Sequence, residues 1–238
     1  MSYTISPPEE TALQAHLQKL RTQLHEDPEL SWQEHRTTRL VRRELEALCL
    51  EPVPLGLPTG TAALLRGALP GPTVGLRADL DALPITERTG AEFASRVPGV
   101  MHACGHDIHM AALLGAARLL AARREQLAGN VLFLFQPAEE AATGAMRVLE
   151  QGLFRRVPMA GMLALHVWPG LAQGQLGIRS GAILSAVDSF EITVTGRGGH
   201  GSAPERACNP IPAGAALASA LTTLRANDLP QAEPAVTA

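Results

Sequence analysis

The sequence has little that would bind nucleic acids or cross membranes. Aromatic residues make up 3% of its 238 residues, and basic residues occur in short pairs such as Arg42-Arg43 rather than in runs. A nucleic-acid surface needs clustered positive charge and rings that stack on bases. No apolar run reaches the roughly 20 residues of a membrane span. We therefore expect no nucleic-acid partner and no membrane partner.

The chain also lacks a disulfide framework and a secretion signal. Its three cysteines, Cys49, Cys104 and Cys208, are too few and too far apart for such a framework. Residues 1–30 contain no hydrophobic region of a signal peptide. We therefore expect a reducing, cytoplasmic location. Hydrophobic residues make up 46% of the chain, which is ample for the core of one large domain, or of one and a half.

One short stretch is dense in metal-ligating side chains. Residues 101–109 hold three of the eight histidines and one of the three cysteines. His102, Cys104 and His106 alternate, so an extended backbone would point them to one side. A helical pattern follows directly, which indicates a loop before a helix N-terminus, where Asp107 can cap the helix.

Thiolate and imidazole ligands together suit a divalent metal such as zinc, manganese, cobalt or nickel. The alternative is a reduced core cysteine beside incidental histidines. For a lone histidine or cysteine that alternative would be the better interpretation, but the density of this stretch favours a metal site.

Hydrophobic periodicity predicts alternating helices and strands. Helices are expected at residues 9–24, 34–48, 107–127, 144–151 and 212–225. Strands are expected at residues 61–66, 73–78, 131–135 and 161–165, with two further short strands at 175–179 and 189–195. This order is typical of an α/β fold with a mostly parallel sheet and covering helices.

Chemically useful residues follow three of these strands. Asp79, the Glu139-Glu140 pair and His166 each come directly after a predicted strand. Ligands of parallel sheets bind beyond the carboxyl ends of the strands. Residues 101–109 precede a helix on the same side, so we expect all four segments to meet at one rim of the sheet.

Each of these residues also has a plainer interpretation. Consecutive side chains diverge, so one of Glu139 and Glu140 can ligate metal while the other faces a substrate, yet a Glu pair is more often solvated surface. His166 alone would more often be a satisfied core histidine. His200, in a glycine-rich loop, can simply be solvated.

Five motifs occur in order along the chain, namely Gly75–Pro84, His102–Asp107, Gln136–Glu140, His166–Pro169 and Gly198–Pro204. With them the chain resembles the dinuclear metallo-amidohydrolases, which include hippurate hydrolases, N-acyl-amino-acid hydrolases and auxin–amino acid conjugate hydrolases. These enzymes are relatives of aminoacylases and zinc carboxypeptidases. The resemblance implies a metal-bearing α/β domain and a smaller α+β lid that commonly mediates dimerisation.

The resemblance also implies roles for the matching residues. Two divalent metal ions would be held by four ligands, Cys104, His106, Glu140 and His166. Cys104 would bridge or lie between the ions. Glu139 resembles the catalytic base, which takes a proton as water attacks and returns it to the leaving amine.

Other residues would support the site. Asp79 resembles the residue that holds the ligands from behind. His200 resembles a lid histidine that binds substrate or stabilises the oxyanion, often by reaching into the partner subunit. Asp107 is expected to form structural hydrogen bonds or to orient a ligand. The same is expected of Asp81, His102 and His109.

Members of this family run considerably longer, and their return segment supplies a final metal-ligating histidine and part of the substrate pocket. We therefore expect a truncated chain. Residues 1–179 would form a metal-binding catalytic domain without its return segment, and residues 180–238 an incomplete α+β lid and dimerisation domain.

The expected activity is metal-dependent hydrolysis of the amide bond of small N-acyl amino acids, as in hippurate hydrolases, with a homodimer through the lid at full length. Two alternatives remain. One is a dipeptidase or aminoacylase of the wider family, and the other is an inactive metal-binding or dimerising remnant.

Overall fold

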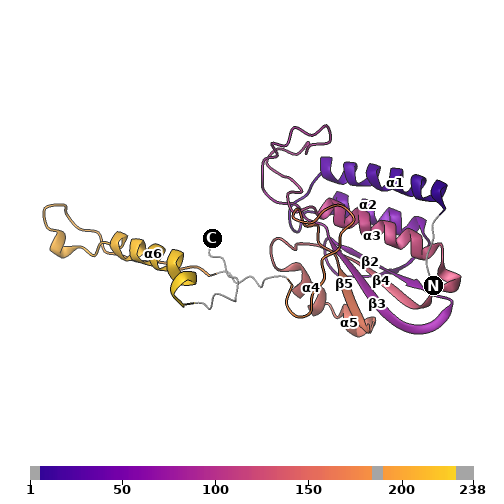
Figure 1. Ribbon diagram of the computed structural model, residues 1–238. Coiled ribbons are helices and arrows are strands. Elements are labelled where there is room, and N and C mark those ends of the chain that lie inside the picture. Colours follow the sequence, from indigo (N-terminus) through magenta and orange to yellow (C-terminus); the bar gives the residue numbers. More distant parts are fainter. Residues whose placement is uncertain (1–5, 184–189, 229–238) are drawn as a thin grey trace. The chain divides into compact units, whose positions relative to one another are not determined.

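The computed structural model describes residues 6–183 and 190–228 of the chain (Figure 1). These residues belong to two compact units, Met1–Ala172 and Gln173–Ala238. The predicted domain boundary lies after Arg179, and the roles assigned to the two domains stay predictions. Among the described residues, no helix has the length and apolar character needed to cross a membrane.

A five-stranded sheet forms the centre of the first unit. In chain order its strands are β1 (Glu51–Val53), β2 (Thr61–Arg66), β3 (Leu69–Asp79), β4 (Ala128–Gln136) and β5 (Gly161–Ala164). The strand order is β1-β2-β4-β3-β5. β3 pairs in parallel with both β4 and β5, whereas β2 is antiparallel to β1 and to β4. Only β2 runs against the others, so the predicted mostly parallel α/β sheet is confirmed.

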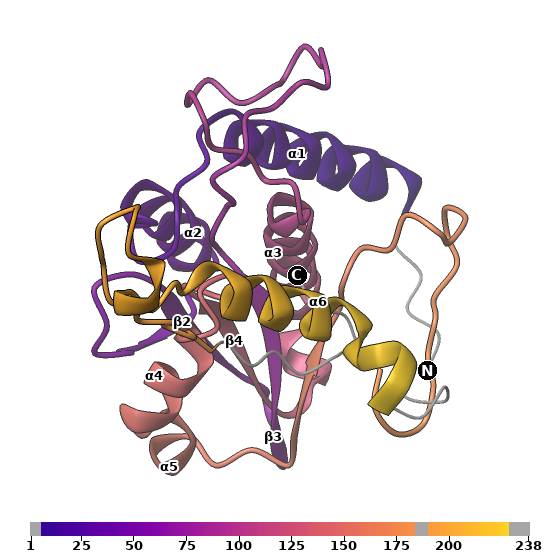
Figure 2. The same ribbon diagram turned by 90° about the vertical axis from the view of Figure 1, so that its left-hand side faces the viewer.

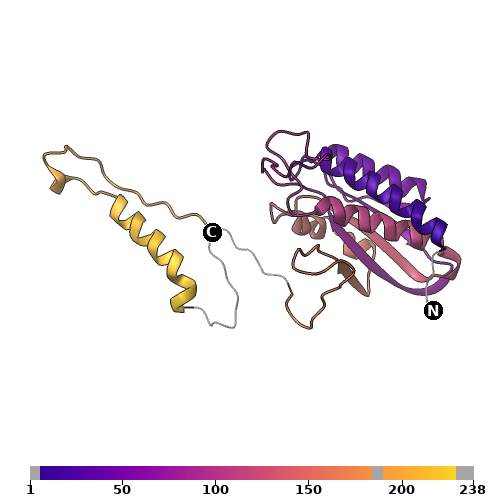
Figure 3. The same ribbon diagram turned by 45° about the horizontal axis from the view of Figure 1, so that its top comes forward.

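Helices cover both faces of this sheet (Figures 1 and 3). On one face lie α1 (Pro7–Glu26), α2 (His35–Ala47) and α3 (His106–Ala121). The other face is covered by α4 (Gly144–Glu150) and α5 (Leu153–Arg156), as Figure 2 also shows. Such a two-sided cover requires a central strand with a continuous apolar run, as residues 131–135 provide in β4.

β4 meets that requirement, and its side chains alternate between two cores. Phe133 and Phe135 pack in the core beneath the three long helices. Leu132 and Leu134 pack on the opposite face, where Val148 of α4 joins them. Because both faces of β4 are buried, packing fixes the position of its carboxyl end, and the segment that carries Glu139 and Glu140 starts there.

The described part of the second unit contains one 3-10 turn, η2 (Pro204–Arg206), and one long helix, α6 (Ile211–Asp228). The strand predicted at 175–179 is absent. Of the strand predicted at 189–195, residues 190–195 form no strand, and Ser189 lies outside the described residues. An extended segment becomes a strand only when a neighbour accepts its backbone hydrogen bonds. Within this unit the described backbone pairing is a single bridge between Arg197 and Cys208.

Replacing Phe133 by alanine should destabilise the first unit strongly. Its ring is fully buried in the central strand, and truncation of such a ring costs about 3–5 kcal/mol of unfolding free energy. Urea denaturation followed by circular dichroism measures this cost. The control is Leu149→Ala on α4, where the side chain is 52% exposed and the expected change is within about 0.5 kcal/mol. Equal effects of the two substitutions would contradict this account of the core.

Candidate metal centre

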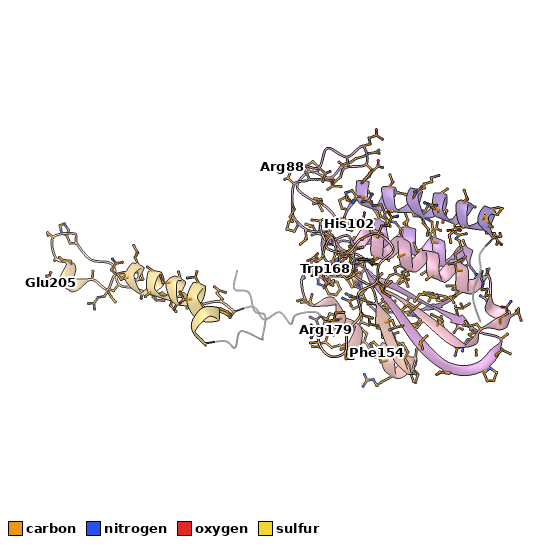
Figure 4. All side chains as sticks on the ribbon, viewed as in Figure 1. Arg88, His102, Phe154, Trp168, Arg179 and Glu205 are labelled. Carbon is orange, nitrogen blue, oxygen red and sulfur yellow. The ribbon has the colours of Figure 1, made fainter. Side chains whose placement is uncertain are left out.

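The predicted ligands lie together at the carboxyl ends of the parallel strands. Three groups of side chains have their ligand atoms within 4.8 Å of one another, and His106 belongs to all three. The groups are Cys104, His106 and His166; His106, Glu139 and Glu140; and Asp79, His106 and His109. Figure 4 labels His102 and Trp168 near this end of the unit. The predicted meeting of four segments at one rim is therefore observed.

His106 turns its Nε2 towards this cluster. Its Nδ1 lies 2.8 Å from the backbone carbonyl oxygen of Asp81. A carbonyl oxygen only accepts, so Nδ1 carries a proton, and Nε2 is the nitrogen at which a metal ion would bind. That Nε2 is buried without a hydrogen-bond partner among the described residues, 3.7 Å from Glu140 Oε1. An imidazole held through Nδ1 with a free Nε2 is the usual arrangement of a metal ligand.

His166 has the same arrangement. Its Nδ1 lies 2.7 Å from the carbonyl oxygen of Val167, and its Nε2 faces the cluster, 3.5 Å from Cys104 Sγ. Glycine is needed opposite this segment, because Gly105 has a φ of +83° and a Cβ there would lie 2.5 Å from Val167. The loop before α3 and the segment after β5 therefore approach each other closely.

Both residues of the glutamate pair reach the cluster, and they differ in exposure. Glu140 is the more enclosed, with 19% of its side chain exposed, and its Oε1 is buried without a partner among the described residues. Glu139 is 39% exposed, and its Oε2 lies 3.9 Å from His106 Nε2. Because an oxygen of each carboxylate lies within 4.8 Å of the other and of His106, the two side chains converge on the cluster, and their predicted divergence is not observed.

The electrostatics of the cluster favour a cation. Burial acts to lower the pKa of His106, but hydrogen bonding to Asp81 and the charges of neighbouring carboxylates raise it to about 9. Burial, followed by the charge of Glu140, raises the pKa of the Cys104 thiol to about 12. Burial also raises the pKa of Glu140. Thiol, imidazole and carboxylate donors with unsatisfied atoms fit a divalent metal ion.

The group of Asp79 and His109 is a hydrogen-bonded pair. His109 Nε2 accepts from the backbone N–H of Val167 at 3.0 Å, so its Nδ1 donates to Asp79 Oδ1 at 2.6 Å. Burial acts to raise the pKa of Asp79, but the bond to His109 and the charges of His106 and Arg77 hold it below its usual range. Because both ring nitrogens of His109 are engaged, this pair supports the cluster from behind.

Asp107 does not cap α3, and that prediction is wrong. Gly105 occupies the N-cap position, and no side chain caps this helix end. Asp107 is fully buried, and its Oδ2 accepts from Arg21 Nε at 2.7 Å and from His25 Nδ1 at 2.8 Å. The cationic groups of α1 provide stronger partners than the exposed amides of a helix end.

His102 does not share a side with Cys104 and His106, which also corrects a prediction. The chain turns between them, with Gly105 N–H donating to the carbonyl of His102, so the period of an extended strand does not apply. His102 is 3% exposed, and neither ring nitrogen has a hydrogen-bond partner among the described residues. Burial lowers its pKa to about 4, so the ring is neutral near neutral pH.

His200 belongs to the second unit. Its Nδ1 accepts from the backbone N–H of Ser202 and lies 2.8 Å from the hydroxyl of that residue. The ring is exposed. Its role in a substrate site stays a prediction.

Sequence reasoning did not identify Glu34, and it did not use the spacing between His106 and His109. Glu34, fully buried, accepts from the backbone N–H of Ala138 at 2.7 Å, and nothing in the sequence around it distinguishes it from an ordinary helix start. His109 lies three residues after His106 on α3. That helical spacing indicates a shared face and could have linked the two histidines.

This fold and this donor set define an α/β protein with a candidate metal centre at its sheet edge. Residues 75–237 match the model of peptidase family M20/M25/M40, and the chain belongs to this family. It is 43% identical over 226 residues to an N-acetylcysteine deacetylase of Bacillus subtilis (strain 168), covering 94% of this chain and 59% of that protein.

Two further similarities point the same way. An N-acyl-L-amino acid amidohydrolase of Geobacillus stearothermophilus is 40% identical, over 91% of this chain and 58% of that protein. The crystal structure of a dinuclear metal-binding M20 peptidase from Bacillus subtilis is 47% identical, with a TM-score of 0.66, over 68% of this chain and 45% of that one. The chain thus spans less than two thirds of each of these relatives.

Replacing His25 by glutamine should remove a pH-dependent contribution to stability. The hydrogen bond to Asp107 raises the pKa of His25 above its ordinary 6.5 against the opposing effect of burial. The contribution is therefore fully present below about pH 6.5 and is lost as the pH rises through the raised pKa. The difference in unfolding free energy between wild type and variant, on the order of 1–3 kcal/mol at pH 6, should shrink towards pH 9.

Denaturant titrations at several pH values measure this difference. The control is His35→Gln, which changes an exposed histidine at the start of α2. A His25→Gln difference that is constant, or that grows with pH, would contradict the assigned ion pair.

Proposed function

We propose that this chain is the core of a metal-dependent amidohydrolase that cleaves the amide bond of small N-acyl amino acids. The observation that carries the proposal is the convergence on His106 of a second imidazole, a thiol and two carboxylates. Nε2 of His106 and Oε1 of Glu140 are buried there without a partner among the described residues. The relatives named as deacetylase and amidohydrolase act on N-acyl amino acids according to their names. These similarities support the same substrate class here.

In this proposal the residues that would hold two divalent ions are Cys104, His106, Glu140 and His166. Their donor types suit zinc, manganese, cobalt or nickel. When bound, the metal pair would supply Lewis acidity for water and for the amide carbonyl. Asp79 orients His109 and, through the backbone of Val167, the segment that carries His166.

Glu139 is proposed as the general base. Its carboxylate is more open than that of Glu140 and still lies beside the ligand cluster. It would take a proton from the attacking water and deliver it to the nitrogen of the leaving amino acid. A positioned acid–base of this kind contributes roughly 10²–10⁴-fold to the rate.

The second unit is proposed as the lid. His200 would bind substrate or stabilise the oxyanion, and the lid would form the contact of a homodimer. A cytoplasmic location agrees with the free thiol that the metal site needs. These points rest on the motif resemblance and not on observed contacts.

Metal binding should depend on the thiol of Cys104. Cys104→Ser is expected to lower zinc or manganese affinity by more than about 10-fold, because a first ligand matters at least as much as the hydrogen-bonded residues behind it. Calorimetric titration and metal content after dialysis measure this. The matched control is Cys49→Ser, an exposed free cysteine in the same unit. Unchanged affinity in Cys104→Ser would remove Cys104 from the site.

Glu139→Gln should abolish most turnover and leave metal binding intact. The expected loss of kcat for N-acetyl- and N-benzoyl-amino acids is about 10²–10⁴-fold, with the metal content of wild type. Glu125→Gln, which changes an exposed glutamate elsewhere, is the control.

A substrate panel tests the competing assignments. Faster hydrolysis of aminoacyl-glycine than of N-acyl-glycine would favour a dipeptidase. Absence of any turnover by the metal-loaded chain would favour an inactive metal-binding protein and overturn the proposed activity of this chain.

A further inference from the structure

Three consecutive backbone amides beside the candidate metal centre bind buried carboxylates. The N–H of Ala138 donates to Glu34 Oε1 at 2.7 Å. The N–H groups of Glu139 and Glu140 donate to the two oxygens of Asp81, at 3.0 Å and 2.9 Å. Both carboxylates are fully buried. We call Glu34 and Asp81 the carboxylate clamp.

The clamp is itself held in place. Ser31 Oγ donates to Asp81 Oδ2 at 2.6 Å, and Thr59 Oγ1 donates to Glu34 Oε2 at 2.7 Å. Every clamp oxygen therefore has a donor, which fixes the direction of both carboxylates.

The segment that the clamp holds has an unusual backbone. Ala138 has a φ of +50° and Ala142 a φ of +53°, a left-handed conformation that residues with a Cβ rarely adopt. Such conformations persist only where the surroundings enforce them, and they gather at functional sites. The carboxylate of Asp81 spans the amides of Glu139 and Glu140, whose side chains both reach the cluster, and its backbone carbonyl accepts from His106 Nδ1.

We propose that Asp81 and Glu34 are positioning residues that set the direction of Glu139 and Glu140 through their backbone amides. The inference rests on the proposed function, because it assigns a task to these two glutamates. Neither clamp residue touches substrate or metal in this role. Asp81 additionally keeps Nε2 of His106 facing the cluster.

Variants at Glu34 separate positioning from packing. In Glu34→Gln the carbonyl oxygen can still accept from Ala138 N–H, and the amide can donate to the Thr59 hydroxyl. Glu34→Met keeps the length and leaves the Ala138 amide without an acceptor. The glutamine variant should keep kcat within about 3-fold of wild type. The methionine variant should lose about 10- to 100-fold in kcat, the size seen for such supporting residues, with KM changed by less than about 3-fold.

Asp81→Asn leaves one of the two glutamate amides facing an NH₂ group. Its cobalt(II) affinity, read from the visible absorption of the bound ion, should fall by about 10- to 100-fold. The matched control is Ser31→Ala, which removes a support of Asp81 but leaves both amide bonds, and it should stay within about 3-fold. Equal cobalt affinity in Asp81→Asn and wild type would overturn the proposal, as would equal kcat in the two Glu34 variants.

Hydrogen–deuterium exchange of the wild-type chain tests the clamp without any variant. The amides of residues 138–140 should exchange as slowly as those of β4, although they lie in a loop. Exchange as fast as that of an exposed loop such as residues 170–174 would overturn the clamp. Cobalt binding and hydrogen exchange do not require turnover. A chain that binds cobalt but hydrolyses no N-acyl amino acid would therefore refute the proposed function alone. The positioning role of Asp81 and Glu34 would then be tested by the cobalt affinities and the exchange rates.

Discussion

The hydrogen bond from His106 Nδ1 to the backbone carbonyl of Asp81 is the interaction on which the candidate metal centre depends. It fixes the direction of a fully enclosed ring and turns Nε2 towards the thiol, the carboxylates and the second imidazole. Without it, nothing would hold Nδ1 as the nitrogen that faces away from the cluster. The bond forms because the segment that follows the carboxyl end of β3 lies next to the start of α3.

The charged side chains buried at this edge of the sheet need hydrogen-bond partners that replace the water they have lost. An unpartnered charge in a protein interior is costly, so buried carboxylates must have donors. Asp79, Asp81 and Asp107 each have them, in His109, backbone amides and the basic groups of α1. Buried atoms without a hydrogen-bond partner among the described residues remain on His106 and Glu140, in the cluster, and also on Arg77, His102 and Asp107. The ligands are therefore recognised by the convergence of their donor atoms on His106 and not by missing partners alone.

Two of the supporting residues, Glu34 and His25, come from segments outside the five motifs. Glu34 lies at the start of α2, more than a hundred residues before the amide that it binds. His25 on α1 holds Asp107 next to the cluster. Substitutions of Glu34 or His25 would therefore reach the candidate metal centre through one or two hydrogen bonds, although neither α1 nor α2 carries a proposed ligand.

Much of this protein was determined by local sequence. The apolar run of β4, the alternation of strands and helices, and the ordered motifs predicted the parallel sheet and the rim at which Cys104, His106, Glu140 and His166 meet. Periodicity and motif order are properties of neighbouring residues, which is why they can be read directly.

Tertiary structure alone decided the rest. The turn at Gly105 separates His102 from the cluster, the basic groups of α1 take Asp107 away from the helix end, and the segments at 175–179 and 190–195 form no strand without a partner. In each case the outcome depends on a group distant in sequence, and a local pattern contains no information about such a partner.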